Sequence, residues 1–422
     1  MKTLSLRVRK SLIPIVLVST LSFSVLADGY RNPPESASAL GKIGGKIAHI
    51  DDVSAVTINP ANLTDLEKPE VMVSLTLGYA VREIDSPYGF SDESEDPWAY
   101  LPAVFAAFPF ADGEYVAGLA LTVPYGRFTD WESDIYFAQA SPYYAEQSVI
   151  NLSPTIAKKI TDKVSVGLGM NVYQSDIMFK QLFPWSSLTM NPADPAGNAR
   201  FEGDGYGVGG NAAVTWKVND NHTLALTYKS PFSIEYDGDF DVSNVPGSAA
   251  AMGVTSSSRF ETEIDYPTVV AAGYGIQLTD TVRVEFDIEW IEHSLNESLP
   301  IDIGANTAIL PSSVIPQDWD DNWTYGFGVD WQFAEEWVAR AGYIFLETPT
   351  PTETTLPVAS EEDQSVVSVG LGYDCETGHS LDVAFAAGIF DGRTVNDNVN
   401  PAVNGDYDFD AYLFSLAYGY TF

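Results

Sequence analysis

The end of the chain alternates between two kinds of side chain. Every even position from Tyr412 to Phe422 is large and apolar, and the odd positions from Ala411 to Thr421 are mostly small or polar. Successive side chains of a β-strand point to opposite faces, so this pattern predicts a strand with one apolar face and one small or polar face. Two folds use such strands: a transmembrane barrel with lipid on one side, and a soluble sandwich with its core on one side.

The same alternation recurs at 164–172, 282–290 and 323–333. In a soluble sandwich the second face meets water and is usually polar, whereas here that face is often Gly or Ala. Strands are predicted at 71–84, 99–110, 114–128, 147–160, 163–178, 203–217, 221–239, 258–278, 281–294, 321–333, 336–348, 363–375, 379–391 and 406–422. Long and short connections alternate between them, as in outer-membrane barrels. We therefore predict an all-β fold, a 14-stranded antiparallel transmembrane β-barrel over 71–422.

The first 27 residues have the organisation of a secretory signal peptide. Four basic residues precede a mostly apolar stretch over 11–26, and Val25-Leu26-Ala27 places small residues at the cleavage positions. The alternative is an N-terminal membrane anchor, but the apolar run is close to the lower limit of about 17 residues for a span. We predict cleavage after Ala27, export, and a multi-pass location in a bacterial outer membrane.

Charge and composition exclude several functions. The chain has 21 Lys and Arg against 58 Asp and Glu, a net charge of −37, whereas nucleic-acid binders need a basic face. Cys375 is the only cysteine and the four histidines are scattered, so no metal or cofactor site is predicted. Carboxylates at Glu285, Asp287 and Glu289 are interpreted as polar lining of a lumen rather than as catalytic acids. We expect no enzymatic activity.

Residues 28–70 do not alternate, yet they carry apolar side chains that need burial, such as Ile43, Ile47 and Val56. An extramembrane tail would leave them in water. A barrel of about 14 strands has a lumen too wide for its own side chains to fill. We therefore predict that 28–70 forms a plug, or hatch, inside the barrel.

One motif within the predicted hatch resembles a known family. The stretch IDDVSAVTINPANL, with Asn59, Pro60 and Ala61, resembles the hatch motif of the outer-membrane long-chain fatty acid transporter family (FadL/TodX). Stretches at 151–172, 203–240 and 338–351 resemble strands of that family in the same order. We expect the Asn59 amide to satisfy backbone groups of the hatch and Pro60 to fix the next turn. An ordinary Asn-Pro turn is the alternative.

The resemblance implies passive outer-membrane transport of long-chain fatty acids or similar hydrophobic compounds. In this scheme external loops capture the ligand, a lumen pocket receives it, and hatch rearrangement releases it, sideways through the barrel wall. A channel for neutral aromatic hydrocarbons is one alternative, and a structural or adhesive barrel or phage receptor is another. The other expected partners are outer-membrane lipid and lipopolysaccharide, and the barrel assembly machinery that reads a C-terminal Phe. We expect a monomer.

A run of apolar residues follows the fifth predicted strand, where most of the chain should face water. Exposed apolar clusters of this kind mark binding surfaces or loop packing. The candidates for ligand capture are Phe179, Leu182, Phe183, Trp185 and Leu188. Packing over the barrel mouth is the alternative.

Two cations and one irregular strand complete the candidate site. Strand parity points Lys229 and Arg340 at the lumen, where a basic group can hold a carboxylate by charge-assisted hydrogen bonds. The alternative is pairing with lumen acids such as Asp330 or Asp382. Pro124 and Gly126 interrupt the third predicted strand, and they predict either a lateral opening in the wall or the end of the strand at the outer rim.

Overall fold

The structure, a computed structural model, describes residues 29–304 and 313–422, so the predicted signal peptide lies outside the described residues. The strands are β1 (Glu70–Asp85), β2 (Ser91–Glu93), β3 (Trp98–Phe110), β4 (Tyr115–Asp130), β5 (Tyr144–Thr161), β6 (Val164–Phe183), β7 (Gly197–Asn219), β8 (His222–Lys229), β9 (Phe232–Val242), β10 (Ser257–Tyr266), β11 (Val269–Thr279), β12 (Val282–Ile291), β13 (Ser298–Asp302), β14 (Ser313–Pro316), β15 (Asn322–Ala334), β16 (Trp337–Leu346), β17 (Gln364–Asp374), β18 (His379–Phe390), β19 (Arg393–Val395) and β20 (Gly405–Thr421). The helices are α1 (Ala37–Gly41), α2 (Ala55–Ile58), α3 (Trp185–Thr189) and α4 (Gly247–Ala251), with 3₁₀ turns η1 (Pro60–Asp65), η2 (His293–Leu295), η4 (Pro357–Ala359) and η5 (Pro401–Val403). Among the described residues, no helix is long and apolar enough to cross a membrane.

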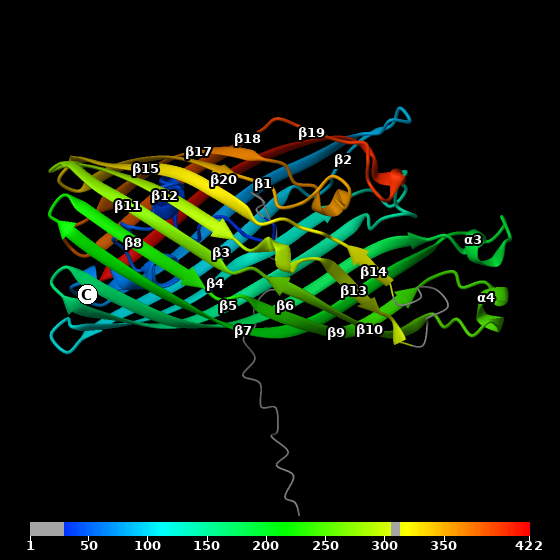
Figure 1. The fold of residues 1–422 in the computed structure, drawn as a ribbon, viewed down its shortest axis with the longest axis horizontal. Helices are drawn as coiled ribbons and strands as arrows, with labels where there is room; N and C mark the ends of the chain where they lie inside the picture. The colour runs from blue at the N-terminus through cyan, green and yellow to red at the C-terminus, as the bar shows by residue number, and fades with distance from the viewer. Residues whose placement is uncertain (1–28, 305–312) are drawn as a thin grey trace, which may run out of the picture.

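The strands form one closed antiparallel sheet. β1 pairs with β3 on one side and with β20 on the other, which closes the barrel. Turns of two to four residues join the strands at one end, and connections of 12 to 30 residues, carrying α3 and α4, project from the other (Figure 1). The predicted fold, a 14-stranded antiparallel barrel, is confirmed; the short strands β2, β13, β14 and β19 lie in the long connections.

Two predicted strands are interrupted in the structure. The strand predicted at 221–239 is divided into β8 and β9 at Ser230 and Pro231, and the strand at 258–278 into β10 and β11 at Pro267 and Thr268. The two breaks lie side by side, since Lys229 pairs with Val269 before them and Phe232 with Tyr266 after them. Proline has no backbone N–H to donate, so it cannot take part fully in the hydrogen-bonded ladder, and each strand breaks at its proline.

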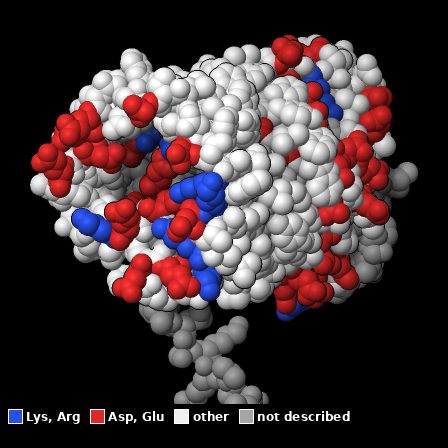
Figure 2. Space-filling view, turned by 60° about the vertical axis from the view of Figure 1, so that its left-hand side comes forward, with Lys and Arg blue, Asp and Glu red and all other residues white. Residues whose placement is uncertain are grey.

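The alternation follows the two faces of the wall. On β20, Tyr412 and Phe414 are 43% and 47% exposed, whereas the intervening Leu413 is 1% exposed. Figure 2 shows the consequence on one face of the molecule: an uncharged band crosses the wall between two ends rich in acidic residues. The large apolar side chains face outward, as a surface in contact with lipid requires.

The segment from 29 to 66 packs against the inward face of the barrel. Its apolar side chains form one cluster with small inward residues of many strands. Gly44 and Gly45 approach the backbones of β15 and β16 very closely. A Cβ on Gly44 would lie 1.9 Å from the Tyr343 carbonyl oxygen of β16, and a Cβ on Gly45 would lie 2.4 Å from the Gly328 nitrogen of β15. This close approach explains why the inner face is rich in Gly and Ala.

Candidate functional site

Carboxylates of β12 hold the backbone of the N-terminal segment. Asp287 accepts the backbone N–H of Lys46 at 2.7 Å, and Glu285 accepts that of His49 at 2.9 Å. The Lys46 ammonium lies 3.1 Å from Glu289. These acids therefore bind the segment.

Asn59 connects three parts of the N-terminal segment and the wall. Its Nδ2 donates to the Ile47 carbonyl at 2.7 Å and to the Thr215 hydroxyl at 2.9 Å, while its Oδ1 accepts the Ala61 N–H at 3.0 Å. Pro60 opens η1 and lies against β6, where a Cβ on Gly167 would come within 2.5 Å of its carbonyl carbon. The Asn59 amide thus makes the backbone contacts expected of it, with a further contact to the wall.

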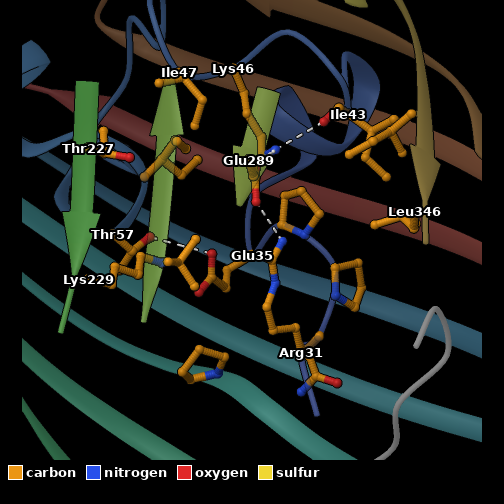
Figure 3. Close-up of a pocket in the computed structure, with 18 of the residues that line it drawn as sticks. Arg31, Glu35, Ile43, Lys46, Ile47, Thr57, Thr227, Lys229, Glu289 and Leu346 are labelled. Atoms are coloured by element: carbon orange, nitrogen blue, oxygen red, sulfur yellow. Dashed lines mark hydrogen bonds and ion pairs between the residues drawn. The ribbon is translucent and has the colours of Figure 1, made fainter. Parts of the chain in front are cut away.

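A cavity of about 110 Å³ lies between this segment and the barrel wall (Figure 3). Much of its lining is apolar, and the apolar lining includes Ile43, Ile47, Ile58, Val269, Ile344 and Leu346. Arg31 crosses it to reach Glu289 at 2.8 Å. Residues 31–35 form one wall, so the start of the described chain belongs to the site.

Lys229 faces this cavity, as strand parity predicts. In Figure 3 it lies beside Glu35 and Thr57, which are joined by a hydrogen bond of 3.4 Å. None of the ion pairs among the described residues includes Lys229. The site therefore offers a cation next to apolar surface, the combination that an amphiphile with an anionic head requires.

Arg340 has different surroundings. Its Nε lies 3.2 Å from Asp330, and its Nη1 lies 2.5 Å from Asp382. Lys42 and Arg283 share Asp330 with it. The candidate role of Arg340 in binding a ligand carboxylate is not supported, because its guanidinium already pairs with two lumen acids, the alternative named above.

The wall is irregular at Pro124. Thr122 pairs with Asn151 and Tyr125 with Val149, so β4 contains one more residue than β5 at this point, a β-bulge. The ladder between β3 and β4 ends at Val104 and Leu121, although both strands continue beyond it. We call this unpaired stretch between β3 and β4 the wall gap.

The N-terminal segment pairs with β4 at the wall gap. The Asn32 N–H donates to the Pro124 carbonyl, and the Gly126 N–H donates to the Tyr30 carbonyl, both at 2.9 Å. Pro124 and Tyr125 also line the cavity. The cavity, the segment and the irregular part of the wall therefore form one continuous site.

Residues 18–422 match the model of a family described as outer membrane protein transport protein (OMPP1/FadL/TodX). The chain belongs to this family. Long-chain fatty acid transport proteins of Escherichia coli K12 and Salmonella typhi are each 22% identical to it over 97% of both chains. A Pseudomonas aeruginosa FadL homologue has the same fold, with a TM-score of 0.83 at 20% identity over 93% of this chain and 100% of that one. The Pseudomonas putida toluene transporter TodX gives 0.72 at 15% identity over 92% and 98%.

As a member of the FadL/TodX family, the chain is an outer-membrane barrel. In such barrels the short turns are periplasmic and the long connections are external. The apolar run at the end of β6 and in α3 was expected mostly to face water, and this expectation is wrong. Trp185 is fully buried and donates to the Ser243 carbonyl at 2.9 Å. Phe179, Leu182, Phe183 and Leu188 are half-buried against two apolar clusters, which combine buried strand residues with residues of the long connections. Loop packing accounts for much of this surface, and ligand capture there stays a prediction.

Sequence reasoning missed a second charged cluster in the FadL/TodX barrel. Arg127 of β4 lies 2.6 Å from Glu361, and the two side chains bind the carbonyl and the N–H of Gly29 at 2.9 Å each. The Tyr30 ring lies 4.9 Å from the Arg127 guanidinium, and burial raises the pKa of the Tyr30 hydroxyl above its ordinary value. The bulge at Pro124 hid this cluster, because one extra residue reverses the strand parity that follows.

Proposed function

We propose that this chain is a passive outer-membrane channel for long-chain fatty acids or similar hydrophobic compounds. The observation that carries the proposal is the cavity. It joins apolar lining, the wall gap and Lys229, a cation with no ion pair among the described residues. External loops capture the ligand, with Phe179, Leu182, Phe183 and Leu188 as the contact surface. Burial of an acyl chain gains about 0.8 kcal/mol per CH₂ group, so capture needs no charge pairing.

The carboxylate of the ligand is held by Lys229. The net charge of −37 repels an anion at long range, but screening limits that repulsion to a Debye length of about 8 Å at physiological salt. Inside the cavity, Lys229 is the cation that the ligand meets without first breaking an ion pair. A charge-assisted hydrogen bond there adds to the apolar contacts of the chain.

The N-terminal segment moves when the ligand enters. Ligand pockets usually measure about 300–1,000 Å³, whereas this cavity is about 110 Å³. Residues 31–35 are the wall that moves, since they precede the first helix and are held by a few polar contacts, such as those to Pro124 and Glu289. Their displacement enlarges the cavity and uncovers the wall gap, so the hatch, residues 28–70, opens from its beginning.

The ligand leaves sideways through the wall gap. Between Leu121 and Asp130, β4 has lost its ladder with β3, and backbone pairing with residues 30–32 replaces it over Pro124–Gly126. An apolar ligand passing there enters lipid without crossing water. This route explains how a barrel with a filled lumen transports hydrophobic molecules.

Uptake of oleate and of hexadecane by cells without their own fatty acid transporter tests the proposal. The wild-type chain should restore oleate uptake, and Lys229→Met should weaken oleate binding roughly tenfold, the value of one hydrogen bond to a charged group, without affecting hexadecane. Lys163→Met, at an exposed short turn, is the matched control. If cells that carry the wild-type chain as a folded barrel did not take up oleate, the proposed function would be contradicted.

A channel for neutral hydrocarbons is the second candidate, because the site continues into aromatic surface. The Tyr125 ring lies 5.1 Å from Tyr266 and 5.7 Å from Phe232, and Phe232 stacks on Tyr173 at 3.8 Å. The solved relative TodX is a toluene transporter. Equal affinity for oleate and hexadecane in the wild type and in Lys229→Met would favour this candidate.

We also propose the remaining partners on general grounds. Alternating aromatics ending in Phe422 form the signal for the barrel assembly machinery, and the acidic external loops contact lipopolysaccharide through divalent cations. Most of the described barrel wall is a closed sheet, which offers few strand edges for pairing with a second copy and so supports a monomer.

A further inference from the structure

Arg82 is a buried arginine on the inward face of β1. Its side chain is in the outer half of the barrel, and the residue is 3% exposed. Its backbone N–H donates to the Ser94 hydroxyl at 2.9 Å, which fixes the position of β1 beyond the end of β3. The guanidinium therefore projects into the barrel where the wall is already irregular.

The guanidinium of Arg82 is poorly satisfied. Nη1 lies 3.5 Å from the Phe128 carbonyl, beyond the usual range for such a bond, and the Phe409 ring lies 4.6 Å from the Cζ atom. Neither Nε nor Nη2 has a hydrogen-bond partner among the described residues, and none of the described carboxylates forms an ion pair with it. Removing a charge from water without pairing it costs several kcal/mol, so an anion that accepted hydrogen bonds from these two donors would offset a large desolvation cost.

The charges around Arg82 leave a local excess of positive charge. Arg127 and Glu361 are the charged groups that act on it. Glu361 is already engaged by Arg127 and by the Gly29 N–H, and Arg393 donates to its backbone carbonyl. Two buried guanidinium groups thus lie near one carboxylate, and that carboxylate pairs with Arg127 rather than with Arg82.

The location of Arg82 links it to ligand passage. Phe128, whose carbonyl it approaches, belongs to the part of β4 beyond Leu121, where the ladder with β3 has ended. Arg82 therefore lies at the outer end of the wall gap. A planar guanidinium with two unused donors matches a carboxylate, which accepts two parallel hydrogen bonds.

We propose that Arg82, with Arg127 beside it, is a second carboxylate-binding site that receives the head group of an amphiphilic ligand at the outer end of the wall gap. This inference rests on the proposed function and adds a head-group site distinct from Lys229. A carboxylate bound there competes with Glu361 for Arg127. Because Glu361 and Arg127 hold Gly29, that competition loosens the N-terminal segment from the cavity.

Calorimetric titration of the purified full-length protein with oleate and with oleyl alcohol tests the site. Arg82→Met should weaken oleate binding roughly tenfold or more and leave oleyl alcohol binding unchanged. The melting temperature should not fall, because the substitution removes an unpaired buried charge. Arg82→Lys should lose part of the oleate affinity, since it keeps the charge but not the fork. Arg259→Met, at a residue 63% exposed in its side chain, is the matched control and should bind both ligands as the wild type does.

Three outcomes would overturn the inference. The first is a folded Arg82→Met variant that binds oleate with the wild-type affinity. The second is an Arg82→Met variant that loses affinity for oleate and for oleyl alcohol equally. The third is an Arg82→Met variant that does not fold, which would make the arginine structural. In each case wild-type uptake of oleate would leave the proposed function standing. A wild-type protein that neither binds nor imports oleate would overturn the proposed function itself.

Discussion

Lys229 and Arg340 have the same charge and both point into the same lumen, yet their surroundings give them different roles. Arg340 is held between Asp330 and Asp382, whereas Lys229 faces apolar lining. A buried cation with two carboxylate partners stabilises the structure around it only as long as all three remain. A cation without a partner can exchange water for a ligand at little structural cost.

The substitution Arg340→Met should therefore be destabilising. It leaves Asp382 without its cation, and breaking a buried ion pair costs about 3–5 kcal/mol. We expect a lower melting temperature for the detergent-solubilised barrel, with unchanged oleate affinity in the folded fraction. Lys229→Met serves as the comparison, with the reverse pattern. Loss of oleate affinity at wild-type stability in Arg340→Met would show that it binds ligand after all.

Gly44 tests the close approach of the N-terminal segment to the wall. A side chain there meets the Tyr343 carbonyl, so Gly44→Val should force the segment away from β15 at a cost of about 1–3 kcal/mol. Single-channel conductance should increase, because a displaced segment uncovers the lumen. Gly247→Val, at a position with open space around it, is the control. Equal conductance in both variants would contradict a plugging role.

For single residues, sequence patterns predicted which face of the wall a side chain points to, but not which residue it pairs with. Parity correctly placed Lys229 and Arg340 on the inward face, and the Asn59 side chain makes the backbone contacts expected of it. Ion pairs join residues far apart in the chain, so the pairing of Arg340 depends on strand register that no local pattern contains. Arg127 was missed for a different reason, because the bulge shifts the parity of every residue that follows it on β4.

Among the elements, β4 is the most informative strand. Its extra residue near Pro124 keeps Tyr125 and Arg127 on the inward face and separates β4 from β3 beyond Leu121. Substituting Pro124 alone retains the extra residue. Deleting Pro124 removes the extra residue and makes the strand regular. Tyr125 then lies two positions after the inward-facing Thr122 instead of three, so Tyr125 and Arg127 still face inward.

Deletion of Pro124 should close the wall gap by letting β4 continue its ladder along β3. We expect oleate uptake to fall strongly while the barrel still migrates differently in SDS gels with and without boiling. Pro124→Val is the matched control and should retain much more uptake. If the folded deletion variant took up oleate at the wild-type rate, lateral release through this gap would be wrong.

Strand positions were predictable because alternation is a local property. The strand predicted at 406–422 is found at Gly405–Thr421, and the short turns fall where two apolar runs nearly meet. The breaks at Pro231 and Pro267 were not predicted, although both prolines are visible in the sequence. Alternation continues on either side of each break, and only the pairing of neighbouring strands shows that the two breaks coincide.

For the whole molecule, the account combines a rigid barrel with a movable start of the chain. The closed sheet and the cluster around α1 and α2 provide the rigid part. Residues 29–35 are held by a few polar contacts, to β4, to Glu289 and to Glu361. Ligand passage is expected to change this segment while the strands stay in place.

Locking that segment to the wall tests the account most directly. Arg31 and Tyr125 form an antiparallel bridge with hydrogen bonds on both sides. Cα atoms in such a pair are about 4.5 Å apart, which suits a disulfide. The double variant Arg31→Cys, Tyr125→Cys, in a Cys375→Ser background, should therefore cross-link when oxidised. The reduced form of the same variant controls for the effect of the substitutions themselves, because it differs from the oxidised form only in the cross-link.

The measurement is oleate uptake by cells carrying this variant, before and after reduction, with the cross-link verified on the purified protein. The account predicts uptake near background in the oxidised form and recovery on reduction, because residues 31–35 must leave the cavity and the wall gap before a ligand can pass. Equal uptake in the fully cross-linked and the reduced forms would contradict it.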